Sequence, residues 1–286
     1  MNQLNLFSYE QISERLWVFT EGYSMLHRFT IGVIVGDEKI LVIDSGLGAT
    51  DNLRETIESV VGTSKLLVCA CTHLHPDHAG SAKRFDEAYC SHLDWPSRAD
   101  FALSTQQRWT DLKAFALDSP EVMEFCQTHI IENADTTFKD IKDGDIFDLG
   151  SVKIEAVAVP GHSAGSMAFF NRKEKYVFTG DAINTDVRLR KLGRVGFASY
   201  REMLKRFIAR VGEDVTLYPA HLPLSMDISI AKNLIVICED LLAGNTAGDP
   251  PGETIFAERN NDPDVRMHYY NNTCIVYSEK MLASQD

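Results

Sequence analysis

Residues that bind metal ions are concentrated in one short segment, THLHPDHAG at positions 72–80. The segment places His73, His75, Asp77 and His78 within six consecutive positions, directly after an apolar run. Imidazole nitrogens and carboxylate oxygens are the ligands expected for zinc, and the same mixture also suits iron or manganese. The pattern predicts a metal site, and the alternative is a polar loop that happens to be rich in histidine.

The elements around this segment would point its ligands in two directions. Residues 66–71 are apolar and predict a buried strand, and Pro76 disfavours helical dihedrals at the residue before it. In an extended chain, the first two histidines of the segment therefore point the same way. Pro76 also suits the first position of a helix over 76–85, which would turn the following aspartate and histidine away from that pair. One segment could thus serve two metals.

Three further candidate ligands each follow a predicted strand: His162 after 153–159, Asp181 after 175–179 and His221 after 215–218. Strand ends at one edge of a sheet can converge in space, so these residues could complete the site that the first cluster begins. Each is weak evidence alone, because an isolated histidine at a strand end is more often a hydrogen-bonded structural residue.

The rest of the chain predicts alternating strands and helices, which indicate layered α and β structure. The expected elements are a hairpin of strands 31–35 and 39–43, a helix over 53–61 ending at Gly62, a helix opened by the capping box SYRE at 199–202, a helix over 227–242 and a strand over 272–278.

Residues 95–135 differ in sequence pattern from the predicted strands, because their aromatic side chains are spread through polar sequence without alternation. We expect helices here, which could form a lid over the metal site or pack their aromatics into the core. The length of 286 residues suits one large domain. We therefore expect a single domain over 1–286, with a helical insertion at 95–135 and a helix and strand extension at 226–286.

Composition narrows the class of partner. With 44% hydrophobic and 24% charged residues, the chain is typical of globular proteins. A formal net charge of −13 argues against nucleic-acid binding, since proteins that bind phosphate backbones display basic surface. We expect a small-molecule substrate, no nucleic acid and no membrane partner, and the sequence leaves a homo-oligomer open.

Six cysteines are scattered without a CxxC pair, and we expect them to be reduced. The start of the sequence lacks a basic leader and an apolar core, and no stretch of about 18 apolar residues occurs. These features predict a cytoplasmic protein.

The motifs resemble those of the metallo-β-lactamase superfamily. HxHxDH is followed by GHSAGS, TGD and PAH, which contain the three further candidate ligands, and DSG at 44–46 matches the family's first motif. The resemblance spans residues from about 15 to 225 and points to the glyoxalase II-like and lactonase-like branch. It implies an α+β fold, an αββα sandwich of two mixed β-sheets flanked by helices, with the metals at one edge between the sheets.

The resemblance also implies roles for the site residues: His73, His75 and His162 would hold one metal, Asp77, His78 and His221 the other, and Asp181 would bridge them. Asp44 would orient a ligand histidine or the loop without binding metal itself, or it is a simple cap at the exit of the hairpin. Two divalent ions are implied, with zinc expected and iron or manganese as alternatives.

The implied activity is that of a metal-dependent hydrolase. Two divalent ions roughly 3.5–4 Å apart can share a bridging hydroxide and polarise a substrate carbonyl. Asp77 would orient this nucleophile or pass a proton to the leaving group, or it would serve only as a ligand. β-Lactamases of the superfamily generally lack an aspartate at the bridging position, so Asp181 shifts the resemblance towards enzymes that cleave a small ester, thioester or lactone.

Candidate substrate contacts flank these motifs. Tyr23, Met25 and His27 precede the first hairpin, and Arg188 and Arg190 follow the TGD motif. A solvent-facing position or core packing is the alternative for the first three, and solvated surface charge is the alternative for the arginines. Two other functions stay open on the same scaffold: an iron-dependent oxidoreductase similar to persulfide dioxygenases, and a ligand-binding or regulatory protein of low turnover.

Overall fold

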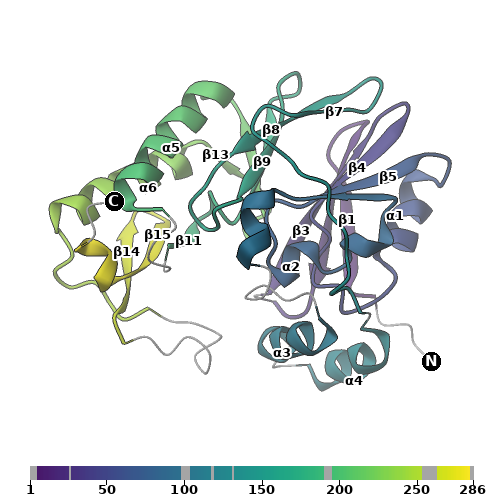
Figure 1. Ribbon diagram of the computed structural model, residues 1–286, viewed down its shortest axis with the longest axis horizontal. Helices are drawn as coiled ribbons and strands as arrows, with labels where there is room; N and C mark the ends of the chain where they lie inside the picture. Colours follow the sequence, from purple (N-terminus) through teal and green to yellow (C-terminus); the bar gives the residue numbers. More distant parts are fainter. Residues whose placement is uncertain are drawn as a thin grey trace.

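Two six-stranded mixed sheets pack face to face in the computed structural model, which describes residues 5–25, 27–97, 104–116, 119–130, 132–189, 195–252 and 263–283 (Figure 1). In spatial order the first sheet contains β1 (Phe7–Gln11), β2 (Leu16–Gly22), β3 (Arg28–Val35), β4 (Lys39–Ile43), β5 (Leu66–Ala70) and β6 (Glu87–Tyr89). The second contains β13 (Met226–Asp227), β12 (Thr216–Pro219), β10 (Tyr176–Gly180), β9 (Met167–Asn171), β8 (Lys153–Ala158) and β7 (Ile146–Asp148). Each sheet combines parallel and antiparallel pairs, as predicted.

The strand β4 shows how the layers are built. Successive side chains of a strand point to opposite faces, and β4 is apolar on both. Leu41 and Ile43 face the second sheet, whereas Ile40 and Val42 face the outer side of the first sheet. Apolar residues on both faces bury this strand between a helix layer and the second sheet, which explains its continuous hydrophobic run.

Helices cover the outer faces of both sheets. The helices are α1 (Leu53–Val61), α2 (Pro76–Ala79), α3 (Thr105–Phe115), α4 (Pro120–His129), α5 (Phe197–Val211) and α6 (Ser229–Ala243), with short 3₁₀ turns η1 (Ala82–Arg84), η2 (His92–Ser97) and η3 (Glu279–Leu282). Leu53 and Ile57 of α1 pack on the first sheet, and α5 and α6 pack on the second. This layering confirms the predicted αββα sandwich.

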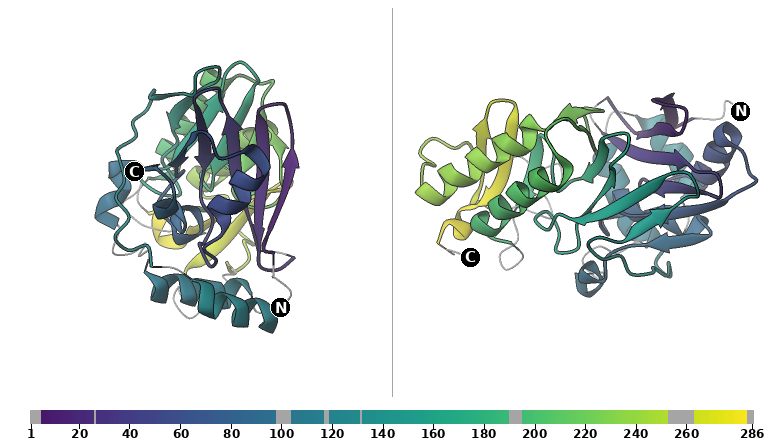
Figure 2. Two further views of the ribbon diagram at one scale, coloured as in Figure 1. Left: turned by 90° about the vertical axis from the view of Figure 1, so that its right-hand side faces the viewer. Right: turned by 90° about the horizontal axis from the view of Figure 1, so that it is seen from above.

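A third sheet lies beyond α6, and it consists of β11 (Asp186–Leu189), β15 (Thr273–Ser278) and β14 (Val265–Tyr270). The right-hand view of Figure 2 shows α5, α6 and this sheet at one end of the molecule and the first sheet at the other. Ile275 and Tyr277 share one hydrophobic core with Val177 and Leu217 of the second sheet. The strand predicted at 272–278 is confirmed, whereas β14 was not anticipated; its last two residues, Tyr269 and Tyr270, are exposed.

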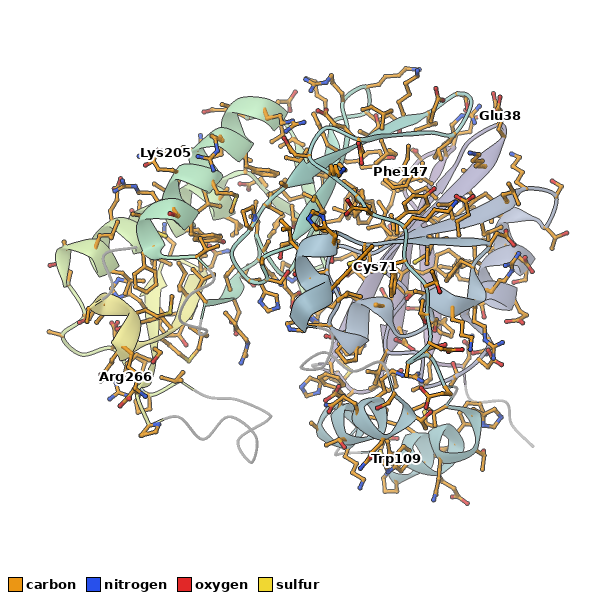
Figure 3. The ribbon with its side chains drawn as sticks, in the orientation of Figure 1. Glu38, Cys71, Trp109, Phe147, Lys205 and Arg266 are labelled. Atoms are coloured by element: carbon orange, nitrogen blue, oxygen red, sulfur yellow. The ribbon has the colours of Figure 1, made fainter. Side chains whose placement is uncertain are left out.

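The segment predicted to be helical does form the helices α3 and α4, which lie below the sheets in Figure 1. Figure 3 shows Trp109 of α3 at this lower end of the molecule, with Cys71 in the interior. Phe115 packs against Tyr23 and Phe29 with ring centroids 6.5 Å and 5.0 Å apart. The described part of this helical pair therefore packs its aromatics into a small core beside the first sheet.

Two predicted helix boundaries were wrong, and tertiary contacts explain both. The helix that begins at Pro76 ends at Ala79, because the backbone of Gly80 turns to bond with Gly46 and approaches Leu47 so closely that an added Cβ would lie 2.1 Å from its carbonyl oxygen. The helix predicted to open at 199–202 begins two residues earlier, at Phe197, because that ring is buried against Tyr277.

All six cysteines are free thiols and are buried. Within the described ranges, none of the helices combines the length and the apolar character needed to cross a bilayer.

Candidate metal centre

The candidate ligands gather at one edge of the sandwich, where several strands reach their carboxyl ends. β10 and β12 run parallel, so Asp181, directly after β10, and His221, two residues after β12, leave the second sheet side by side. His162 follows β8, and the segment with His73 and His75 follows β5 of the first sheet. Each strand is followed by a loop that carries one or more candidate ligands at this edge.

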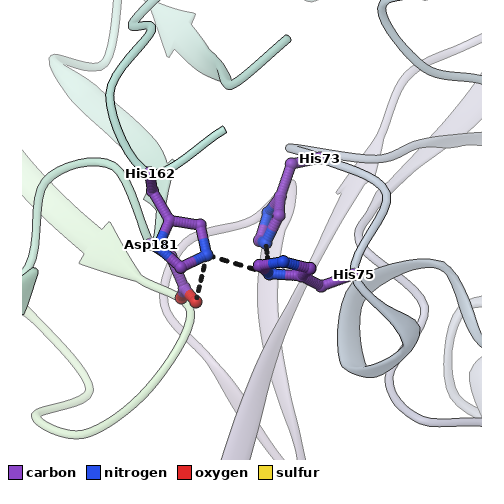
Figure 4. A group of neighbouring side chains, drawn as sticks. All are labelled: His73, His75, His162 and Asp181. Atoms are coloured by element: carbon purple, nitrogen blue, oxygen red, sulfur yellow. Dashed lines mark hydrogen bonds and ion pairs between the residues drawn. The ribbon is translucent and has the colours of Figure 1, made fainter. Parts of the chain in front are cut away.

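The first group consists of His73, His75, His162 and Asp181, whose ligand atoms all lie within 4.8 Å of one another (Figure 4). His75 is extended as predicted, with φ −63° and ψ 149°. Its Nδ1 lies 2.7 Å from Nε2 of His73 and 2.9 Å from Nε2 of His162. Three ring nitrogens thus point at one another, and a cation between them would accept all three lone pairs.

Burial keeps His73 and His162 of the first group neutral. It lowers the pKa of His73 well below its ordinary value, with the nearby charge of His78 acting in the same direction. Burial also lowers the pKa of His162 to about 4, although the carboxylate of Asp181 opposes this shift. Neutral imidazole is the form that binds metal, so this group needs no proton release at neutral pH.

The second group consists of Asp77, His78 and His221, and Asp181 lies between it and the first. Nε2 of His78 is 3.6 Å from Oδ2 of Asp77 and 3.6 Å from Oδ2 of Asp181. Nε2 of His221 is 3.2 Å from Oδ1 of Asp181, and Nε2 of His162 is 3.4 Å from Oδ2 of the same carboxylate. Asp181 therefore reaches histidines of both groups, as a bridging ligand must.

Carboxylates give the second group the opposite electrostatics. Burial lowers the pKa of His78, but Asp77, Asp181 and Asp44 outweigh it and hold that pKa well above its ordinary value. The same balance of burial against Asp181 and Asp77 raises the pKa of His221. Burial raises the pKa of Asp181, but the three histidines around it hold that pKa well below the usual range. The negative charge here attracts cations.

Asp44 sets the tautomer of His78. Oδ2 of Asp44 lies 2.9 Å from Nδ1 of His78, so in the neutral ring that binds metal Nδ1 carries the proton and the lone pair of Nε2 faces the centre. Asp44 also accepts hydrogen bonds from the backbone N–H and the hydroxyl of Thr72, and it adopts φ 61°, a left-handed conformation that non-glycine residues rarely hold. This placement fits the orienting role implied for Asp44.

Buried polar atoms that make no hydrogen bond indicate that these residues fit metal ions. Within the part of the chain that the structure describes, Nε2 of His78 and Oδ1 of Asp181 are buried and make no hydrogen bond. Unsatisfied buried polar atoms are costly, and a coordinated cation would satisfy both. Both groups could therefore hold metal ions, and the donor set itself does not choose between zinc, iron and manganese.

The residues proposed for substrate contact lie in different environments. Tyr23 is buried and its hydroxyl donates to Oε1 of Glu21 at 2.6 Å, so its placement gives no support to substrate contact. His27 is half-buried, with Nδ1 3.0 Å from the carbonyl oxygen of Phe115. Met25 is 76% exposed.

Of the two arginines proposed for substrate contact, the structure describes Arg188. Arg188 lies on β11 with about one third of its side chain exposed, and it bonds to Asp186 at 3.2 Å. Its charge also contributes to the lowered pKa of His162, which places it near the first group. Arg190 lies outside the described residues.

Sequence reasoning missed two buried carboxylates beside the ligands. Glu21 is fully buried, accepts the backbone N–H of Leu47 at 2.7 Å and thereby fixes the loop after Asp44; burial raises its pKa to about 7. Asp94 is fully buried in η2 between the two loops of the first group. Neither belongs to a motif, and no spacing signal in the chain distinguishes them from surface acids.

The sequence is similar to a known protein family and to individual enzymes. The profile of the metallo-beta-lactamase superfamily matches residues 30–221. The chain is 24% identical over 194 residues to the human acyl-coenzyme A thioesterase MBLAC2, covering 64% of this chain and 68% of the relative. It is 28% identical over 155 residues to hydroxyacylglutathione hydrolase GloC of Haemophilus influenzae, covering 53% of this chain and 65% of that protein.

The fold is likewise similar to solved structures. A metallo-beta-lactamase from Pontibacter korlensis superposes with a TM-score of 0.60 at 17% identity, covering 82% of this chain and 99% of that one. A di-iron-bound form of TTHA1623 has a TM-score of 0.55 at 19% identity, covering 76% and 98%. The motifs, the sandwich and the profile match agree, and the chain belongs to the metallo-beta-lactamase superfamily.

Proposed function

We propose that this protein is a metal-dependent hydrolase that binds two divalent metal ions and cleaves a small ester, thioester or lactone. The observation that carries the proposal is Asp181, whose two carboxylate oxygens lie 3.4 Å from His162 and 3.2 Å from His221. One carboxylate shared by two ligand groups is the arrangement that a dinuclear centre needs. Bound there, the metals would supply an activated water and polarise the substrate carbonyl.

The ligand assignment follows the two groups: His73, His75 and His162 for one metal, Asp77, His78 and His221 for the other, with Asp181 shared. Asp77 keeps 16% of its side chain exposed while lying 3.6 Å from both His78 and His221. A carboxylate in that position can pass a proton to the leaving group as the carbon–sulfur or carbon–oxygen bond breaks. We therefore assign Asp77 this role in addition to metal binding.

A thioester is the favoured substrate class. Two relatives bear the names of hydrolases that act on acyl-coenzyme A and hydroxyacylglutathione, both of which are thioesters with anionic groups remote from the reacting carbonyl. Arg188 offers a partly exposed guanidinium on the side of His162, and guanidinium groups pair bidentately with carboxylate or phosphate. We propose that Arg188 binds such a remote anion.

The test is a hydrolysis screen with protein of defined metal content. Substrates would be acyl-coenzyme A, hydroxyacylglutathione, an acyl-homoserine lactone, a β-lactam and a phosphodiester. We expect thioesters to be cleaved fastest, activity to vanish with a chelator and activity to return with zinc. Absence of hydrolysis across the whole panel, with two metals bound, would contradict the proposal.

Arg188→Ala tests the anion contact in the same screen. It should raise KM for coenzyme A and glutathione thioesters and leave KM for an uncharged thioester unchanged. An equal effect on both would argue against Arg188. The other open functions give distinct results: oxygen consumption with a persulfide by the iron-loaded protein indicates an oxidoreductase, and tight ligand binding without turnover indicates a regulatory protein.

A further inference from the structure

Asp94 lies where the two loops that carry the first ligand group meet. Its Oδ2 accepts hydrogen bonds from the backbone N–H of Leu74 at 3.2 Å and from the hydroxyl of Ser163 at 2.9 Å, and its Oδ1 accepts the backbone N–H of Gly165 at 2.7 Å. Leu74 is the residue between two of the ligands, and Ser163 directly follows the third. One buried carboxylate thus touches both loops.

These loops belong to different sheets. The first follows β5, and the second connects β8 to β9, so their relative position depends on contacts across the sandwich. A backbone bond from Met167 to Thr72 at 2.8 Å provides another link. Gly165 approaches Asp94 so closely that an added Cβ would lie 2.8 Å from its side chain. The loop therefore needs glycine there in order to reach the carboxylate.

The segment that carries Asp94 is itself anchored. The backbone N–H of His92 donates to Oδ1 of Asp140 at 2.9 Å, and that of Asp94 donates to the carbonyl oxygen of Ser91. Leu93 and Trp95, on either side of Asp94, are 50% and 42% exposed, so the turn directs only the carboxylate inwards. The carboxylate of Asp94 is therefore held in a fixed position where it accepts hydrogen bonds from both loops.

We propose that Asp94 is a positioning residue that holds His73, His75 and His162 in one arrangement for the first metal. The inference rests on the proposed metal centre. The second group has its own orienting carboxylate, Asp44, bonded to His78. Loss of the Asp94 carboxylate would leave buried backbone donors unsatisfied and allow the loops to separate, which would weaken the first metal site selectively.

The experiment measures how Asp94→Asn changes zinc affinity in two variants that each retain only one of the two ligand groups. His221→Ala leaves the first group intact, and His162→Ala leaves the second. Asparagine keeps the shape but replaces one acceptor oxygen with an NH₂ group that cannot accept a hydrogen bond. Zinc affinity is measured by competition with a chromophoric chelator, and cobalt absorption reports coordination geometry. Asp94→Asn should weaken zinc binding about tenfold in the His221→Ala background and not in the other.

Asp86→Asn is the matched control. Oδ2 of Asp86 accepts the backbone N–H of Leu67 at 2.9 Å, at the start of β5, and the same carboxylate pairs with Arg54. This variant therefore weakens a carboxylate-to-backbone contact near the ligand segment without touching either ligand loop. It should leave zinc affinity and the cobalt spectrum unchanged. Equal losses in both backgrounds, or no loss in either, overturn the inference, and so does an equal effect of the control.

A milder variant keeps the test decisive if Asp94→Asn fails to fold. Ser163→Ala removes only the hydroxyl donor and should give a smaller loss of zinc affinity in the same background; unchanged affinity there overturns the inference. A parent protein that binds no divalent metal contradicts the proposed metal centre and, with it, the role of Asp94. A parent that binds two metals, with Asp94→Asn unaltered, contradicts only the role of Asp94.

Discussion

The two ligand groups, a few ångströms apart, are built on opposite electrostatic principles. In the first, burial lowers the pKa values of His73 and His162, and His73 is only 1% exposed. The second surrounds its histidines with carboxylates that raise their pKa values, and the side chain of His221 is one third exposed. The first group is thus ready for a cation at neutral pH, whereas the second must release protons to bind one.

The groups also differ in how their geometry is maintained. In the second, Asp44 bonds directly to a ligand imidazole, and Glu21 fixes the loop that follows Asp44. In the first, Asp94 bonds to backbone and hydroxyl groups beside the ligands. Orientation through the imidazole controls the tautomer, whereas orientation through the backbone controls the distance between loops.

The largest effect is expected from removing a ligand of the first group. His73→Ala should lower kcat/KM by more than about a hundredfold, because losing a ligand exceeds the ten- to hundredfold cost typical of residues that only orient one. Steady-state hydrolysis of the best thioester measures this. The fold should persist in thermal unfolding, and undiminished hydrolysis would remove the first group from the mechanism.

Asp44→Asn should weaken the second metal by about ten- to hundredfold and spare the first. The amide can present its NH₂ to His78, and the histidine tautomer would then no longer be fixed with its Nε2 lone pair towards the metal. Zinc titration in the His162→Ala background measures the effect. An equal loss in the His221→Ala background would show that Asp44 supports the whole edge rather than one group.

Acid should remove the two metals separately. The pKa of His162 is about 4, whereas the pKa of His78 lies well above its ordinary value, so protons compete with metal at the second group first as the pH falls. Each competing proton costs about tenfold in apparent affinity per pH unit below its pKa. Metal content after dialysis at decreasing pH should fall from two to one and then to none. A single concerted loss would contradict the difference between the groups.

Glu21→Gln should have the smallest effect on metal binding and a measurable effect on stability. The pKa of Glu21 is raised from 4.5 to about 7, so its contribution to stability is present below pH 4.5 and is lost as the pH rises through about 7. The loss amounts to at most roughly 3 kcal/mol. Urea unfolding of the metal-free protein should show this decline between pH 4.5 and about 7, and the variant should lack it. A parallel decline in the variant would assign the pH dependence elsewhere.

Sequence reasoning succeeded where local rules decide the outcome. Alternating and continuous apolar runs predicted β3, β4 and β5, and Pro76 predicted the extended backbone at His75. It failed where distant residues decide, as at Gly80, whose contact with Leu47 ends α2, and at Phe197, whose burial extends α5. β14 was missed although its residues Val265 to Tyr269 alternate apolar and polar side chains, the pattern typical of a strand.

The sequence by itself determined the chemistry of the candidate ligands and their positions after strands, because residue type and hydrophobic periodicity are local properties of the chain. It could not show that Asp181 lies between His162 and His221, or that Glu21 and Asp94 are buried beside the ligands. Those facts arise from packing two sheets against each other, since burial and proximity depend on residues far apart in the chain. The tertiary structure alone lowered the pKa values of His73 and His162 and raised those of His78 and His221.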